Sequence, residues 1–217
     1  MSDIESQARR SLRIGLPSIP AAPEDLTTWR GALSADARNT LARGRWPAAF
    51  LAIGWIHLAY FVVLQLIDDN QPHSDLRHPL VWILELLTIL GVLTWAGGLR
   101  WFAASPAVSV FARLWGTFLI LSFNLSAMNA QTGWSMNWYK PVWANLSAFL
   151  FAMLGSFFQP RYFLLACLMF VTGLAMLHLP DWDYLIYGVS WWICIEIIGI
   201  GLLRRKRVDA AKQAGTA

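Results

Sequence analysis

The sequence predicts an all-α integral membrane protein, a bundle of six transmembrane helices with an N-terminal amphipathic helix at the membrane interface. Of its 217 residues, 57% are hydrophobic and only 14% are charged, whereas about a quarter of the residues in a soluble domain are charged. Six apolar runs are long enough to cross a bilayer, which takes about 20 helical residues. They must be helices, because backbone groups in lipid need hydrogen-bond partners within the segment.

The same composition excludes several classes of protein. A chain this apolar is neither disordered nor a nucleic-acid-binding module, and we expect no nucleic acid partner. Its two cysteines, Cys167 and Cys194, cannot form a disulfide framework. Both fall inside apolar runs and are best interpreted as small hydrophobic residues.

The chain divides into three parts. Residues 1–46 form an N-terminal tail, residues 47–203 the transmembrane bundle and residues 204–217 a basic tail. The loops between spans are too short to hold a soluble domain, so any chemistry must lie within the bundle, at its rims or on a partner. The expected spans are approximately 47–67, 79–98, 107–128, 141–158, 162–178 and 184–203.

Within the N-terminal tail, residues 24–45 have the pattern of an amphipathic helix. Apolar side chains recur at spacings of three and four along one face, at Leu26, Trp29, Leu33, Ala37 and Leu41. Arginines lie among the polar neighbours, which favours a helix on the cytoplasmic leaflet. The alternative is a helix that packs against a partner domain.

Basic residues predict the orientation. Fourteen of the 17 Lys and Arg residues fall in the two tails and in the second and fourth loops. Because cytoplasmic segments carry the excess of Lys and Arg, both termini are expected in the cytoplasm, at a plasma or inner membrane. The run Arg204–Arg207 directly follows the last span and is expected to bind anionic lipid.

Polar residues inside the predicted spans are the candidate site, because an ionisable group at mid-membrane costs about 2.5–3.5 kcal/mol and suggests a function. Depth along each helix predicts two clusters. The inner cluster pairs Arg113 with Glu196 and has His57 as a third member. The outer cluster holds Glu85, Asn124 and Asn145.

The third span links the two clusters. A polar stripe repeats along one face of this helix and is expected to face the bundle interior. Each intramembrane charge also has a purely structural alternative, such as an arginine that reaches the rim, a packing histidine or a salt bridge. The stripe comprises Ser109, Arg113, Thr117, Asn124 and Gln131.

No motif specifies a cofactor, a metal or a set of catalytic residues. The sequence contains no Cys-x-x-Cys, His-x-x-x-His, Gly-x-Ser-x-Gly or P-loop pattern. His57 and His178 differ too much in depth to bind one haem. His78 and His178, with Asp75 or Asp181, form a weaker metal candidate at the outer rim.

Three functions remain open. The leading hypothesis is a membrane protein without enzymatic activity, in which a polar intramembrane path binds or passes protons or a small solute. The second is a structural, sensor or anchoring subunit of a membrane complex. The third is an intramembrane enzyme that uses the Asp and His residues of the outer rim.

Overall fold

The computed structural model describes residues 26–70, 77–132 and 136–215. These residues form helices and contain no strand. In chain order the helices are α2 (Leu26–Leu41), α3 (Trp46–Asn70), α4 (Arg77–Gly97), η1 (Trp101–Ala103), α5 (Pro106–Thr132), α6 (Met136–Phe157), α7 (Tyr162–His178), η2 (Pro180–Trp182) and α8 (Asp183–Gly215). Residues 1–25, which belong to the predicted N-terminal tail, lie outside the described part of the chain.

Four long apolar helices indicate that the chain is a membrane protein. By length and composition α3, α4, α5 and the η2–α8 segment can each cross a bilayer. The helix α7 is also apolar but shorter, with 17 residues. The all-helical fold and the membrane nature of the chain therefore agree with the sequence prediction.

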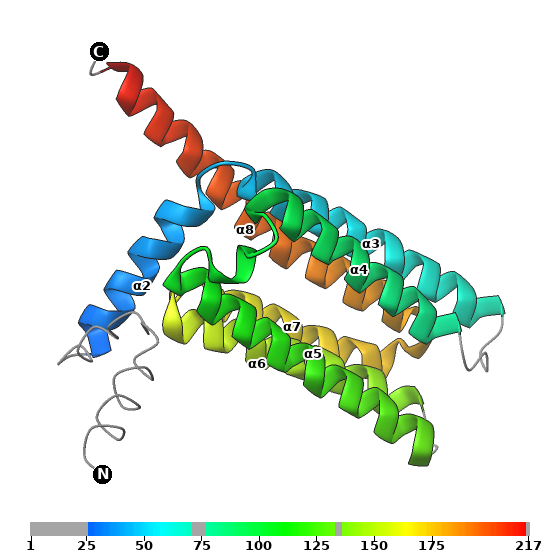
Figure 1. Ribbon diagram of the computed structural model, residues 1–217. Coiled ribbons are helices and arrows are strands. Elements are labelled where there is room, and N and C mark those ends of the chain that lie inside the picture. The colour runs from blue at the N-terminus through cyan, green and yellow to red at the C-terminus, as the bar shows by residue number, and fades with distance from the viewer. Residues whose placement is uncertain (1–25, 71–76, 133–135, 216–217) are drawn as a thin grey trace, which may run out of the picture.

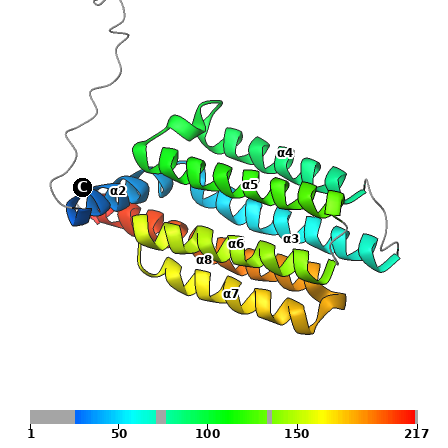
Figure 2. The ribbon, with the colours of Figure 1, turned by 90° about the horizontal axis from the view of Figure 1, so that it is seen from below.

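The helices form two layers (Figures 1 and 2). The first layer holds α3, α4 and α8, and the second holds α5, α6 and α7. The most extensive contacts lie within the layers, between α3 and α8 and between α6 and α7. The two layers meet mainly where α7 packs on α8, whereas α4 and α5 make few direct contacts.

Within the first layer, glycines let α3 and α8 approach closely. A Cβ atom added at Gly188 would lie 2.5 Å from the Cβ of Phe61. One added at Gly199 would lie 2.8 Å from a side-chain carbon of Leu51. Small residues at such crossings bring backbones together and increase van der Waals contact, the main attraction between helices in lipid.

The end of the bundle that contains Arg38, Arg161 and Arg205 is called the basic end below. The helix α2 lies across it, as Figure 1 shows. Asp36 of α2 accepts a hydrogen bond from the backbone N–H of Ala107 at 2.8 Å, which caps the first turn of α5. Lys206 of α8 donates to the carbonyl of Gly44 at 2.8 Å, so the chain just before α3 and the C-terminal part of α8 meet at this end.

The opposite end, called the acidic end, is closed by an ionic network. Lys140 of α6 donates to Asp68 of α3 at 2.9 Å and to Asp183 of α8 at 2.8 Å. Gln65 of α3 donates to the backbone carbonyl of Asp181 at 2.7 Å. These bonds connect three helices from both layers.

Two helices differ most in extent from the sequence prediction. α6 begins at Met136 rather than near residue 141, so Pro141 lies inside the helix. α8 continues to Gly215 instead of ending near residue 203, because the basic segment that follows is made of good helix formers such as Arg, Lys, Ala and Gln. Of the predicted helix 24–45, residues Leu26–Leu41 form α2. This helix packs on the bundle, where its Trp29 ring contacts Phe157 of α6 edge-on at 5.7 Å.

Candidate functional site

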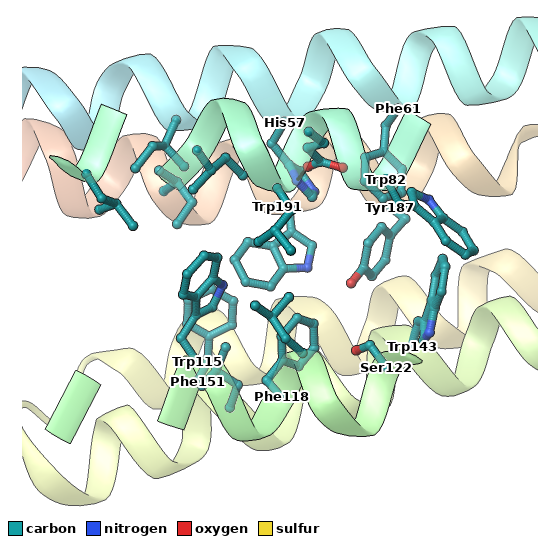
Figure 3. A pocket seen from close by; sticks show the side chains of 18 of the residues that line it. His57, Phe61, Trp82, Trp115, Phe118, Ser122, Trp143, Phe151, Tyr187 and Trp191 are labelled. Carbon is teal, nitrogen blue, oxygen red and sulfur yellow. Dashed lines mark hydrogen bonds and ion pairs between the residues drawn. The ribbon is translucent and has the colours of Figure 1, made fainter. Parts of the chain in front are cut away.

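A cavity of about 150 Å³ lies between the two layers (Figure 3). Its walls are almost entirely apolar and aromatic, with side chains from α3, α4, α5, α6 and α8. Phe123, which lines the cavity, is 41% exposed. The α5 part of the cavity wall is therefore also exposed on the outside of the molecule.

A histidine–carboxyl pair is the polar centre of this cavity. Nδ1 of His57 on α3 lies 2.5 Å from Oε1 of Glu85 on α4. Both groups line the cavity, and their side chains are only 13% and 9% exposed. The two residues stand near the middle of consecutive helices, so the hairpin formed by α3 and α4 brings them together.

Aromatic rings fix the position of His57. Its imidazole centroid lies 4.4 Å from that of Phe61 and 5.3 Å from that of Trp191. Trp191 is held in turn by a hydrogen bond from its Nε1 to Ser147 Oγ at 3.0 Å. Tyr187, which also faces the cavity, bonds the same hydroxyl at 2.8 Å. The imidazole thus sits in a pre-formed aromatic surround.

Several polar atoms on the cavity wall have no hydrogen-bond partner among the described residues. They are Nε2 of His57, Nε1 of Trp82, Nε1 of Trp143 and Oγ of Ser122. Most buried polar atoms are paired, and each exception needs an explanation. Because an indole N–H can only donate, the two tryptophans require an acceptor. A molecule that carries an oxygen atom and enters the cavity would supply one.

Nε2 of His57 can either donate a hydrogen bond to a ligand or accept one from it, depending on where the protons of the His57–Glu85 pair lie. If Glu85 carries the shared proton, Nδ1 of His57 accepts and Nε2 donates. If that proton moves to Nδ1 the ring is an imidazolium and Nε2 still donates, and Nε2 accepts only when the pair has lost one further proton and the ring is neutral with its proton on Nδ1. The pair therefore can serve either a carbonyl or a hydroxyl group, while the surrounding rings bind the apolar part of the same molecule.

The structure does not bring the predicted inner cluster together. Arg113 is exposed on α5, and none of the ion pairs among the described residues joins it to Glu196. Glu196 lies instead at the contact of α8 with α3, where its Oε1 would be 2.8 Å from a Cβ added at Gly54. The pairing was wrong because depth gives the height of a residue but not the side of the bundle it faces.

The predicted outer cluster is also separated. Glu85 bonds His57, whereas Asn124 and Asn145 are both exposed. Asn145 donates to the carbonyl of Pro141 in its own helix at 3.2 Å. The amide of Asn124 donates to the sulfur of Met128 in its own helix, at 3.8 Å. Neither asparagine lines the cavity.

Most of the described part of the polar stripe on the third predicted span faces outward, and its first member, Ser109, is half-buried. Thr117, like Arg113 and Asn124, is exposed, while Phe111, Trp115 and Phe118 of the same helix line the cavity. Both faces repeat with helical spacing. Periodicity identified a polar face but could not show which face the bundle buries. The side chain of Gln131 lies outside the described part.

The outer-rim histidines are far from equivalent. His78 is buried, stacks on Tyr184 with ring centroids 5.7 Å apart, and has its Nε2 3.8 Å from Asp68. His178 is exposed. In the described part of the chain, no three His, Cys, Asp or Glu residues are grouped to hold a metal ion. Asp75 of the metal candidate lies outside that part.

Sequence reasoning missed two features. The aromatic cavity was not predicted, because tryptophans in a membrane protein are usually interfacial. Lys140 was counted only as a loop cation, although it is 3% exposed and bridges two carboxylates. The sequence signal for this network was one lysine, Lys140, on the same predicted side as the acidic residues at 68–69 and 181–183.

Comparison of this chain with protein-family models, with curated proteins and with solved structures found no match.

Proposed function

We propose that this protein is a six-helix integral membrane protein that binds a small lipophilic molecule between its two layers. The observation that carries the proposal is the His57–Glu85 pair, which lines an apolar cavity and whose buried ring nitrogen Nε2 has no hydrogen-bond partner among the described residues. The pair would bond an oxygen of the molecule, and the aromatic walls would hold its ring or chain. The sequence suggested a protein that binds or passes protons or a small solute, and of these alternatives we propose binding.

The six-span count is part of the proposal. Besides the four helices that are long and apolar enough to span a membrane, the two layers contain α6, with 22 residues, and α7, with 17. At about 1.5 Å per residue, α7 is about 25 Å long, close to the thickness of a thin hydrocarbon core. It packs along both α6 and α8. With six crossings, both termini would lie in the cytoplasm and α2 on the inner leaflet.

Binding of duroquinone to the purified full-length protein tests the proposal. Duroquinone carries two carbonyl oxygens on a single methylated ring, and durene is a similar methylated ring without them. The probe should quench the fluorescence of the cavity tryptophans, which include Trp82 and Trp143. We expect saturable quenching by duroquinone, about tenfold weaker in His57→Phe, because a lost hydrogen bond costs about 1 kcal/mol or somewhat more. Durene should bind both proteins equally.

The matched control is Asn124→Ala, which changes an exposed polar residue outside the cavity. It should leave the affinity for duroquinone unchanged. Quenching that does not saturate, or an equal affinity in His57→Phe and the wild-type protein, would contradict the proposal.

A second candidate function, an anchoring subunit of a membrane complex, is favoured by one observation. The outward face of α5 carries Arg113, Thr117 and Asn124 within a helix that is apolar enough to span the membrane. Polar residues in transmembrane helices rarely face lipid and usually contact another helix. A partner helix packed on this face would satisfy them.

A further inference from the structure

A second cavity, of about 200 Å³, lies at the basic end. Arginines from three separate elements line it: Arg38 from α2, Arg161 from the turn before α7, and Arg205 from α8. No acidic side chain is among the lining residues of the described chain. Three positive charges around one hollow favour an anionic group.

The arginines are largely available for such a group. Nε of Arg38 is buried and has no hydrogen-bond partner among the described residues. Arg205 approaches Asp209 only at 3.9 Å, with both side chains about half exposed. Such an exposed i,i+4 pair contributes little. The guanidinium of Arg161 lies over the Tyr162 ring at 5.6 Å, which orients it without neutralising it.

The second cavity adjoins the central one. Both are lined by the same four apolar residues, two from the first layer and two from the second: Phe50, Ile198, Phe111 and Leu154. A cationic mouth at the basic end thus borders the apolar, aromatic space that holds the His57–Glu85 pair. This is the polarity pattern of an amphiphile with an anionic head and an apolar tail.

We propose that Arg38, Arg161 and Arg205 bind the phosphate headgroup of an anionic lipid, and that one of its chains enters the central cavity. The headgroup site depends only on the arginines, whereas the placement of the chain rests on the function proposed above. Arginine is suited to this role because its planar fork bonds phosphate oxygens in pairs. The site differs from the general attraction of lipid by Arg204–Arg207, because it is a cavity built from three elements.

Native mass spectrometry of the detergent-purified protein tests the proposal with two lipids of identical chains, phosphatidylglycerol and phosphatidylcholine. The wild-type protein should bind the anionic lipid more tightly. Arg38→Gln and Arg205→Gln should each weaken phosphatidylglycerol binding about fivefold, the effect expected of one basic residue near an anionic headgroup. Phosphatidylcholine carries the same phosphate beside a cationic choline, so both variants should weaken its binding less than that of phosphatidylglycerol.

Arg204→Gln is the matched control, since it removes the neighbouring charge on α8 but does not line the cavity. It should leave the lipid preference intact. Equal affinity for the two lipids, or an equal loss in Arg204→Gln and Arg205→Gln, would overturn the headgroup site.

Two further measurements separate the sources of phosphate and the two proposals. Glycerol phosphate, a headgroup without chains, should compete poorly. Competition as strong as that of the whole lipid would overturn the assignment of a lipid. Duroquinone has no phosphate, so its binding should be unchanged in Arg38→Gln. A wild-type protein that binds duroquinone but does not prefer phosphatidylglycerol would contradict the headgroup site alone and leave the function proposed above standing.

Discussion

At the scale of single residues, Lys140 has the most unusual environment at the acidic end. Its side chain is 3% exposed, its ammonium group bonds Asp68 and Asp183, and it lies 4.0 Å from the centroid of the Tyr184 ring. A buried cation is tolerated only when its charge is paired and its protons are bonded. Lys140 therefore has a structural role, in which it joins α6 to α3 and α8.

Replacement of this lysine should destabilise the whole bundle. Lys140→Met leaves two carboxylates close together without their counter-ion, and removal of one partner from a buried ion pair costs about 3–5 kcal/mol. The expected result is a clear drop in melting temperature, measured by fluorescence-detected size exclusion after heating in detergent.

The control for this prediction is Arg207→Met, which removes an exposed charge on α8. It should melt like the wild-type protein. The double variant Lys140→Met with Asp183→Asn should recover part of the loss, because it removes one of the two uncompensated charges. Equal melting temperatures for Lys140→Met and Arg207→Met would show that the ionic network does not hold the helices together.

The same residues show how far the sequence could predict the site. His57 and Glu85 were both identified as intramembrane ionisable residues from hydropathy alone, but were assigned to different clusters. Depth differences of a few ångströms separated them, whereas rotation of each helix about its axis decides which side chains meet. That rotation depends on how each helix packs against its neighbours, so it could not be predicted from the sequence pattern of the individual helices.

At the scale of helices, α5 is the element whose two faces contrast most. Its inner face lines the cavity with Phe111, Trp115 and Phe118, and its outer face exposes Thr117 and Asn124. Interhelical hydrogen bonds in lipid contribute on average about 0.6 kcal/mol each. The outer face is thus suited to modest, specific association with another transmembrane helix.

Substitution on this face tests the second candidate function. If α5 anchors a partner, protein purified from its native membrane in mild detergent should carry a second polypeptide in fixed stoichiometry. Thr117→Val combined with Asn124→Leu should weaken that complex about threefold for each lost hydrogen bond. Light scattering coupled to size exclusion measures the mass of the complex.

Leu164→Val serves as the control, because Leu164 is an equally exposed but apolar position on α7. It should leave the mass of the complex unchanged. A wild-type protein that is monomeric at every detergent concentration tested would argue against the anchoring function.

Helix extents illustrate a second limit of sequence reasoning. The apolar run predicted a span that begins near Pro141. The helix nevertheless begins at Met136, which places Lys140 inside α6. Pro141 is the sixth residue of α6, so it removes the backbone hydrogen bond to the carbonyl of residue 137, and the helix nevertheless includes the turn before it. Helix existence was predictable and its boundary was not.

At the scale of the whole molecule, the polar groups are sorted along the bundle. The basic end holds the arginine-lined cavity, the middle holds the His57–Glu85 pair, and the acidic end holds the Lys140 network. The chain around Gly44 and the C-terminal part of α8 meet at the basic end. If the helices cross a membrane in this arrangement, the positive-inside rule places that end in the cytoplasm.

Labelling of single cysteines tests this topology. In a background with Cys167→Ala and Cys194→Ala, new cysteines are introduced near each terminus and at the acidic end, as Ser2→Cys, Thr216→Cys and Asp181→Cys. A membrane-impermeant maleimide reacts only with thiols that reach water on its own side. With six crossings, Asp181→Cys should react in intact cells, while Ser2→Cys and Thr216→Cys should react only in inverted vesicles. Labelling of the two terminal cysteines from opposite sides would require an odd number of crossings and contradict the six-span count. Labelling of both in intact cells would reverse the orientation and place the arginine-lined cavity outside the cytoplasm.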